Sequence, residues 1–190
     1  MSENAASETS GENYDVVLLI EQALTAQDAT QVHSLHEGLD VPVTYHVLLP
    51  LEDAAARIES AMGSLTAGDM LASPTMPMSE VDLQAVRKDC QDRSNSELDE
   101  TLAALRASGA TAVGQVVVEP PIDALAAKLT EVDGREAIIL TRPHVVAEFF
   151  HLDWTSKARR KLGVPILHLL EHETFDEQAE GYGDEGVTGL

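Results

Sequence analysis

Five short runs of apolar residues, mostly rich in β-branched side chains, recur along the chain. They occupy residues 16–20, 43–49, 112–118, 137–141 and 164–170. Each run has the length of a strand, and its apolar residues are nearly continuous rather than alternating with polar ones. Strands that are apolar on both faces are typical of parallel sheets, which helices cover on both sides. The pattern therefore predicts five buried, parallel strands.

The segments between these runs repeat their apolar residues with the period of an α-helix. The stripes fall at residues 32–39, 55–65, 83–105, 122–132 and 150–162. Asp28 is the predicted cap of the first helix. The third stripe is either one long helix or two abutting ones, because both Ser79 and Ser96 begin capping-box patterns and Gly109 marks a stop. Pro121 suits the first position of the fourth helix, and Gly134 is predicted to end it.

Strands and helices thus alternate, and each pair of strands is separated by a helix long enough for a right-handed crossover. We predict an α/β fold with a doubly wound, Rossmann-like, five-stranded parallel sheet over residues 14–173. An irregular insert at residues 63–79 is either a mobile flap over a site or a long surface loop. Residues 1–13 and the acidic residues 174–190 are polar and poor in apolar side chains, so we expect two disordered tails.

Composition excludes several classes of protein. The 12 basic and 33 acidic residues give a net charge of −21, which disfavours nucleic acids and anionic membranes as partners. No apolar run approaches the roughly 20 residues of a membrane span. The first residues lack the basic and apolar regions of a signal peptide, so we expect a cytoplasmic protein. A single cysteine, Cys90, excludes an internal disulfide, and its place on an apolar stripe predicts a buried thiol.

One segment is locally basic. Residues 142–161 hold five basic and two acidic residues, a net +3, which is either a solvated helix face or a region that attracts an anion. Ligands of open parallel sheets bind beyond the carboxyl ends of the strands, where the strand order reverses. The loop after the fourth strand pairs Arg142 and His144 with a following helix, and is the predicted phosphate-facing loop.

The spacing of two histidines suggests a metal-binding site, but the rest of the sequence supports such a site poorly. His33 and His36 lie one helical turn apart with Asp40 beyond them, but the spacing lacks the glutamate of a zinc-binding HExxH motif. We therefore predict packing or surface histidines and no metal site. Glu171 would raise the pKa of His168 if the two lay close. No nucleophile with a partnered base is recognisable, so no catalytic residues are assigned.

Three short motifs together resemble the universal stress protein family, over roughly residues 15–172. Residues 46–50 (HVLLP) are similar to the end of the family's second strand, and residues 109–113 (GATAV) and 163–167 (GVPIL) to its characteristic turns. The resemblance implies an adenine nucleotide alpha hydrolase-like sheet in the order 3-2-1-4-5 and a homodimer formed through the last strand. It also implies, as in some members, ATP or another nucleotide bound between the first and fourth strands.

The family's ATP-binding members carry Gly-x-x-Gly, nine residues, then Gly with Ser or Thr. Aligned on Thr155 and Ser156, this pattern places Arg142 and Val145 at the two leading glycine positions, and all three glycines are absent. Glu21 stands where the family commonly has aspartate. The loop after the fourth strand and the resemblance together give the following candidate ligand-binding residues: Glu21, Val47, Arg142, His144, Thr155 and Ser156. The resemblance implies a dimer edge at Val164, Ile166 and His168.

Three functions follow as hypotheses. The first is a non-enzymatic, dimeric regulatory or interaction protein with a degenerate nucleotide site and no certain cofactor. The alternative is a small-molecule sensor, in which Arg142, Thr155 and Ser156 hold an anionic group and Glu21 meets a ribose or another polyol. The third is a catalytic domain with His144 or Glu21 as general base.

Overall fold

The computed structural model describes residues 13–52, 80–141 and 161–170. Within these ranges five strands form one sheet in the order β3-β2-β1-β4-β5, and every neighbouring pair is parallel. The strands are β1 (Tyr14–Ile20), β2 (Val43–Pro50), β3 (Thr111–Val117), β4 (Glu136–Thr141) and β5 (Ile166–Leu170). The predicted fold class and the strand order implied by the family resemblance are both confirmed.

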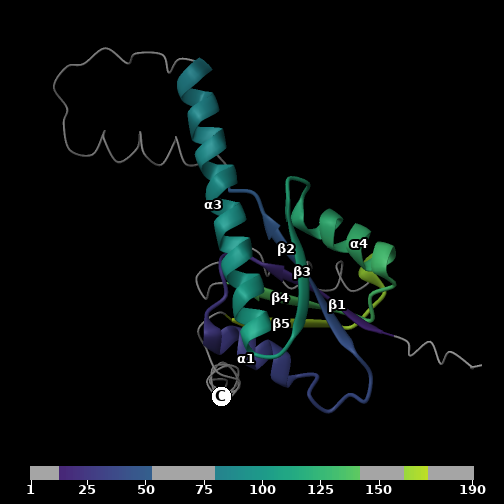
Figure 1. Cartoon of the computed structure of the whole chain (residues 1–190). Coiled ribbons are helices and arrows are strands. Elements are labelled where there is room, and N and C mark those ends of the chain that lie inside the picture. Colours follow the sequence, from purple (N-terminus) through teal and green to yellow (C-terminus); the bar gives the residue numbers. More distant parts are fainter. Residues whose placement is uncertain (1–12, 53–79, 142–160, 171–190) are drawn as a thin grey trace, which may run out of the picture.

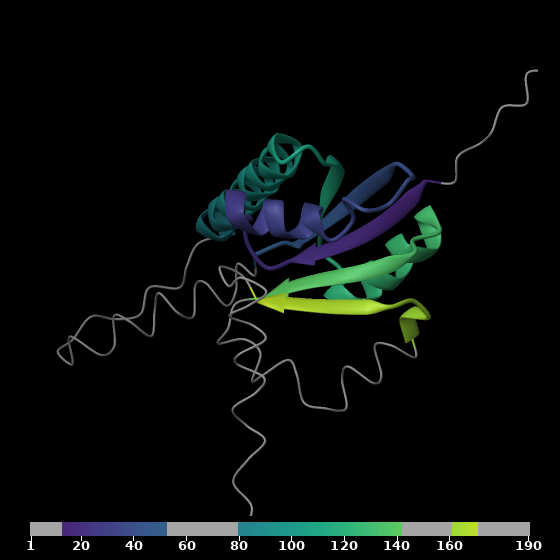
Figure 2. The same cartoon turned by 90° about the horizontal axis from the view of Figure 1, so that it is seen from below.

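Helices cover both faces of the sheet. α1 (Ala26–Ser34) and α3 (Glu80–Ala107) lie on one face, and α4 (Pro121–Val132) lies on the other, as Figures 1 and 2 show. The two faces use alternate residues of β1: Val16 and Leu18 belong to the core under α1 and α3, whereas Val17 and Leu19 belong to the core under α4. Burial on both sides explains the nearly continuous apolar runs in the sequence.

α1 begins and ends earlier than its apolar stripe predicts. The N-cap is Thr25, whose hydroxyl accepts the N–H of Asp28, while the Asp28 carboxylate accepts the N–H of Thr25. Asp28 is therefore the third residue of a capping box and not the cap itself. The helix ends at Ser34, and a turn carries the chain through His36 to Leu39. The helical prediction for residues 35–39 is wrong, although His36 is still directed into the protein.

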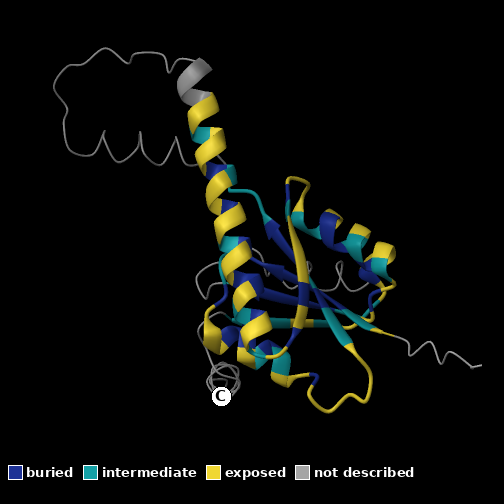
Figure 3. Ribbon diagram, viewed as in Figure 1, coloured by how far each residue is buried: buried dark blue, intermediate teal, exposed yellow. Residues whose placement is uncertain are grey.

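α3 is one continuous helix of 28 residues, so the alternative of two abutting helices is wrong. Ser96 lies in its interior and caps nothing. Its predicted apolar stripe is confirmed where it meets the sheet: Leu98, Leu102 and Leu105 are buried, as is Cys90. At 1.5 Å per residue the helix is about 42 Å long, against roughly 25 Å for a strand of the sheet. Its amino-terminal part consequently extends beyond the sheet, with a largely exposed surface (Figures 1 and 3).

The turn after α4 differs from the prediction in one residue. Asp133, not glycine, adopts the left-handed conformation that ends the helix, with φ of 50°. Gly134 is required for a different reason, because a Cβ there would lie 2.7 Å from Leu129 Cδ2 and 3.3 Å from Val17 Cγ2. The glycine allows the chain to pass close beneath α4 before it enters β4.

β5 begins at Ile166 and not at residue 164. Val164 and Ile166 both pack against the core under α4, Val164 from the turn that precedes the strand. The predicted tails, the insert at residues 63–79 and the helices at 55–65 and 150–160 lie outside the described residues. In the described ranges, no helix combines the length and the apolar character of a membrane span.

Candidate functional site

The boundary between β1 and β4 is the topological switch point of the sheet. Both strands lie in its centre, with the crossover through α1 leading from β1 to one side and β5 lying on the other side of β4. Ile20 at the end of β1 pairs with Leu140 of β4. The next residues along each strand, Glu21 and Thr141, therefore stand at the mouth of this boundary. We call the line of strand ends formed by Ile20, Pro50, Thr141 and Leu170 the carboxyl edge.

α1 starts at this edge, but its own capping box already uses its N-terminus. The Asp28 carboxylate accepts hydrogen bonds from the backbone N–H of Thr25 at 3.1 Å and from the Thr25 hydroxyl at 2.6 Å. Asp28 is buried, and its negative charge faces the positive end of the helix dipole. An anionic ligand would meet the Asp28 carboxylate here. A phosphate site at the start of α1 is thus disfavoured.

The described side chains at the carboxyl edge are mainly acidic. Glu21 is half-buried after β1, and Glu52, just beyond β2, lies 3.8 Å from the Arg93 guanidinium across an exposed ion pair. Exposed pairs of this kind contribute little to stability. Carboxylates at this edge are suited to accept hydrogen bonds from hydroxyl groups of a ligand, and their charge disfavours several phosphates.

His168 of β5 lies beside the end of β4. Its Nε2 is 2.9 Å from the Thr141 hydroxyl. Burial lowers the pKa of His168 to about 4, so the imidazole is neutral at pH 7. The increase in pKa expected from neighbouring glutamates is therefore not observed, because burial of the ring disfavours its charged form.

Only part of the predicted ligand site lies in the described ranges. Glu21 is at the switch point, as predicted. Val47 is fully buried under α3, and its side chain belongs to the core. The remaining predicted ligand residues lie outside the described residues: Arg142, His144, Thr155 and Ser156.

The predicted dimer residues lie at or near one edge of the sheet, because β5 is its last strand. Ile166 and His168 are half-buried on the face that carries α4, and Val164 precedes the strand. On the opposite face of β5, Leu167 is 37% exposed. An edge strand presents unpaired backbone groups, which is the geometry that strand pairing requires.

We call the opposite ends of the strands, where the strands begin, the amino edge. A hydrogen-bonded group of side chains lies there that the sequence did not predict. His36 is buried there, with Nδ1 2.7 Å from the Tyr45 hydroxyl and Nε2 2.7 Å from the Glu136 carboxylate. The Tyr14 hydroxyl donates to the other oxygen of Glu136 at 3.1 Å. The hydrogen bond from His36 holds the pKa of Glu136 below its ordinary value, although burial opposes this.

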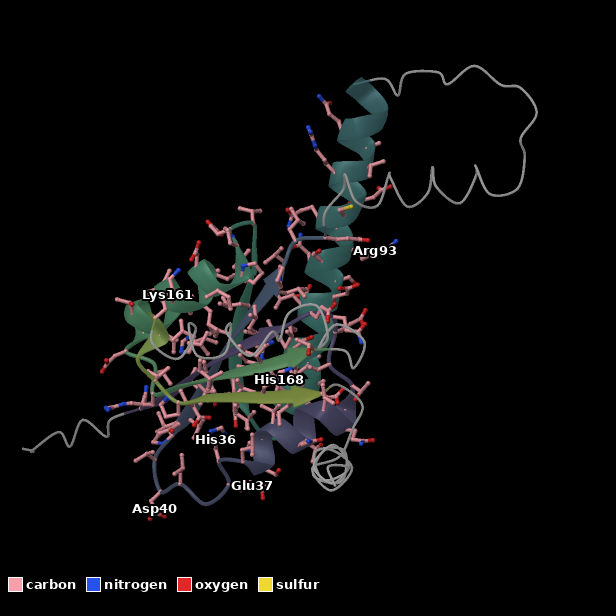
Figure 4. All side chains as sticks on the ribbon, turned by 180° about the vertical axis from the view of Figure 1, so that it is seen from behind. His36, Glu37, Asp40, Arg93, Lys161 and His168 are labelled. Atoms are coloured by element: carbon pink, nitrogen blue, oxygen red, sulfur yellow. The ribbon has the colours of Figure 1, made fainter. Side chains whose placement is uncertain are left out.

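A second pair lies on the other face of the same edge, where His46 Nε2 is 2.7 Å from Asp15 Oδ1. Figure 4 shows His36 and Arg93 at opposite ends of the sheet, which separates these pairs from the candidate ligand site. Both nitrogens of His36 have protein partners, so it is a packing histidine, as predicted. The described part of the chain holds no group of three or more side chains arranged to bind a metal ion. The inward direction of His36 could be read from its stripe, but its partner Glu136 could not be singled out among 33 acidic residues.

No protein-family model matches the chain, and no curated protein matches it. Several solved structures are similar to the chain. The hypothetical protein MJ0577 is similar over 85% of this chain and 99% of its own, with a TM-score of 0.52 and 10% identity. A universal stress protein from Archaeoglobus fulgidus is similar over 82% of this chain and 92% of its own (TM-score 0.47, 14% identity). An Arabidopsis thaliana universal stress protein family protein, solved with AMP bound, is similar over 83% and 92% (TM-score 0.47, 9% identity).

Identities this low establish a common fold and do not transfer a ligand. The likeness to MJ0577 spans nearly all of that chain, and the strand order agrees with the order implied by the three motifs of the sequence. The parallel sheet in the order 3-2-1-4-5 and the similarity to MJ0577 together show that the chain has a Rossmann-like α/β fold.

Proposed function

We propose that this protein is a non-enzymatic regulatory protein that binds an adenine nucleotide with few phosphates, such as AMP, at the β1–β4 switch point. The observation that carries the proposal is the pairing of Ile20 with Leu140, which brings Glu21 and Thr141 to adjacent strand ends at the carboxyl edge. Ligands of open parallel sheets bind at such a point. A carboxylate such as Glu21 is a suitable acceptor for the hydroxyl groups of a ribose.

The charge of the molecule limits the number of phosphates that the site would tolerate. The chain carries −21, Asp28 occupies the start of α1, and Glu21 stands at the switch point. Each further phosphate adds repulsion within this field. Arg142 directly follows Thr141 in the sequence and is the cation that we assign to a single phosphate group. AMP should therefore bind more tightly than ATP.

A regulatory role is proposed rather than turnover because no motif that pairs a nucleophile with a base is recognisable in the sequence. The two described histidine–carboxylate pairs, His36 with Glu136 and His46 with Asp15, lie at the amino edge. We also propose that the protein is a homodimer that pairs through β5, since this strand ends the sheet and exposes Leu167. Light scattering on the purified protein would give its mass directly, and a monomer would remove this part of the proposal.

The test is a calorimetric titration with adenosine, AMP and ATP, each with and without magnesium. We expect AMP to bind most tightly, Arg142→Ala to weaken AMP while sparing adenosine, and Glu21→Gln to weaken both. Arg87→Ala, an exposed arginine on α3, is the matched control and should change nothing. Absence of heat and of thermal stabilisation with all three ligands would overturn nucleotide binding. Hydrolysis of ATP above background that Ser156→Ala abolishes would overturn the non-enzymatic part.

A further inference from the structure

Two hydroxyl groups of α3 hold the backbone of the two loops that follow β1 and β2. The Thr101 hydroxyl accepts the N–H of Leu24 at 3.1 Å, and the Ser94 hydroxyl accepts the N–H of Glu52 at 3.3 Å. Both side chains are almost completely buried, with exposed fractions of 0% for Thr101 and 2% for Ser94. They are seven residues apart, so they lie two turns apart on one face of the helix.

The direction of the Thr101 bond is fixed by a second contact. Its hydroxyl donates to the carbonyl of Glu97 at 2.9 Å, one helical turn earlier, so its lone pairs remain available for the N–H of Leu24. The hydroxyl stands next to Leu98 and Leu102 in a stripe that otherwise buries apolar side chains. A buried backbone N–H that loses its acceptor destabilises the fold, which is the reason for a polar group at this place.

The two loops belong to adjacent strands at the carboxyl edge. Leu24 comes three residues after Glu21 and directly before the Thr25 cap of α1. Glu52 follows the end of β2 and also contacts Arg93, the residue before Ser94. A rotation or a shift of α3 along its axis would therefore displace both loops together. The helix is itself held close to the sheet, because Leu98 packs directly over Gly114 of β3.

We infer that Ser94 and Thr101 are positioning residues for ligand binding, which fix the loops after β1 and β2 through the backbone of Leu24 and Glu52. The inference rests on the proposed function for its ligand, whereas the hydrogen bonds that it invokes can be tested without one. Neither hydroxyl contacts the ligand in this scheme. Each sets the position of the backbone beside it, and the loop after β1 in turn carries Glu21.

The first measurement is amide hydrogen exchange, followed by NMR, in the wild type and in Thr101→Val, Thr101→Ser and Ser94→Ala. Thr101→Val keeps the shape of the side chain but removes the acceptor. We expect the amide of Leu24 to exchange at least about 5-fold faster in this variant, and the amide of Glu52 to do so in Ser94→Ala. Thr101→Ser retains the hydroxyl and should restore slow exchange.

The second measurement is the affinity for AMP in the same variants. We expect Thr101→Val to weaken binding about 5- to 30-fold and Thr101→Ser to restore it to near the wild-type value. Thr130→Val is the matched control, because the Thr130 hydroxyl makes the same backward bond to Ala126 O at an exposed position of α4 and no hydrogen bond from it to a loop is observed. It should leave both the exchange of Leu24 and the affinity unchanged.

The two measurements separate the failure of this inference from the failure of the proposed function. Wild-type protein that binds no adenosine or nucleotide overturns the proposed function, and the role in binding with it. Binding by the wild type that is unchanged in both Thr101→Val and Ser94→Ala overturns the inference alone, as does unchanged exchange of Leu24 and Glu52. If Thr101→Val fails to fold, Ser94→Ala and the rescue by Thr101→Ser carry the test.

Discussion

The two edges of the sheet use polar groups in different ways. At the amino edge, side chains bond to side chains across separate elements: His36 links Tyr45 of β2 to Glu136 of β4, and His46 links β2 to Asp15 of β1. At the carboxyl edge, the hydroxyls of Ser94 and Thr101 also hold the backbone of loops. The first arrangement pairs buried polar groups with one another and is suited to stability. The second fixes the loops that follow β1 and β2, which is the arrangement that the proposed binding site would require.

If the amino edge serves stability, removing its shared carboxylate should have the largest effect on unfolding. Glu136→Ala removes the acceptor of both His36 and Tyr14 and leaves a buried imidazole without its carboxylate. We expect the free energy of unfolding to fall by about 2–4 kcal/mol. Urea denaturation measures this, with AMP titration as the second readout, and the affinity for AMP should not change.

The control for this experiment is Glu131→Ala, which removes an exposed carboxylate paired with Lys128 on α4. Its effect should stay within about 0.5 kcal/mol. Equal effects of the two substitutions would mean that the buried group at the amino edge is no more important than a surface ion pair.

The close approach of α3 to the sheet allows the carboxyl edge to be disturbed from a distance. A Cβ added at Gly114 would lie 2.8 Å from Leu98 Cδ1 and 3.1 Å from the backbone oxygen of Val47. We expect Gly114→Ala to destabilise the protein by about 1–3 kcal/mol and to weaken AMP binding, because the Leu98 side chain of α3 and the Val47 backbone must both shift to admit the Cβ. Thermal unfolding and calorimetry would measure the two effects.

Gly38→Ala is the matched substitution, since a Cβ there meets nothing within 4 Å. It should be neutral or slightly stabilising through the unfolded chain. A loss of stability in Gly114→Ala without any change in AMP affinity would show that the carboxyl edge tolerates movement of α3.

The smallest expected effect concerns pH. The unfolded chain protonates His168 near its ordinary pKa of 6.5, but the folded protein does so only near 4. Between these values the unfolded state binds more protons, so stability should fall as the pH decreases from about 6.5 to 4. Because the ring is partly exposed, we expect a contribution of only about 1 kcal/mol.

The variant His168→Asn would isolate this contribution. It removes the titrating group while keeping a polar side chain beside Thr141, so it should lose less stability than the wild type between pH 6.5 and pH 4.5. Urea denaturation across that range provides the comparison. The loss linked to Glu136 is expected at lower pH, because its pKa lies below the ordinary value of 4.5 and its stabilising charge is removed only under more acidic conditions. Parallel curves for wild type and variant would contradict the assignment to His168.

The sequence predicted the framework well because burial leaves a clear pattern in it. Val16 to Ile20 are apolar at every position, and Pro121 marked the start of α4 correctly. The end of α1 was harder, since Leu35 and Leu39 continue the helical spacing although the chain has already turned. Periodicity shows where apolar residues recur and not whether the backbone between them remains helical.

The candidate site was predictable only in part. The position of Glu21 could be predicted, because it directly follows the first strand and the order of the strands along the chain can be read from the sequence. Val47 was assigned from the family resemblance, and its burial under α3 depends on packing that a motif does not contain. The role of Thr101 could not be predicted from the sequence, because its hydroxyl accepts the N–H of Leu24, which is 77 residues away along the chain.

The hydrogen bonds of Tyr14 and Asp15 have a consequence for how the strands are aligned. The two residues are consecutive in β1, so they point to opposite faces, where one meets Glu136 and the other His46. The rest of β1 is apolar on both faces. A slip by one residue would exchange the side chains that face α1 and α3 with those that face α4, without exposing an apolar side chain. Only the polar pair would then face the wrong partners. These two side chains thus give β1 a unique register that its hydrophobic residues alone do not specify.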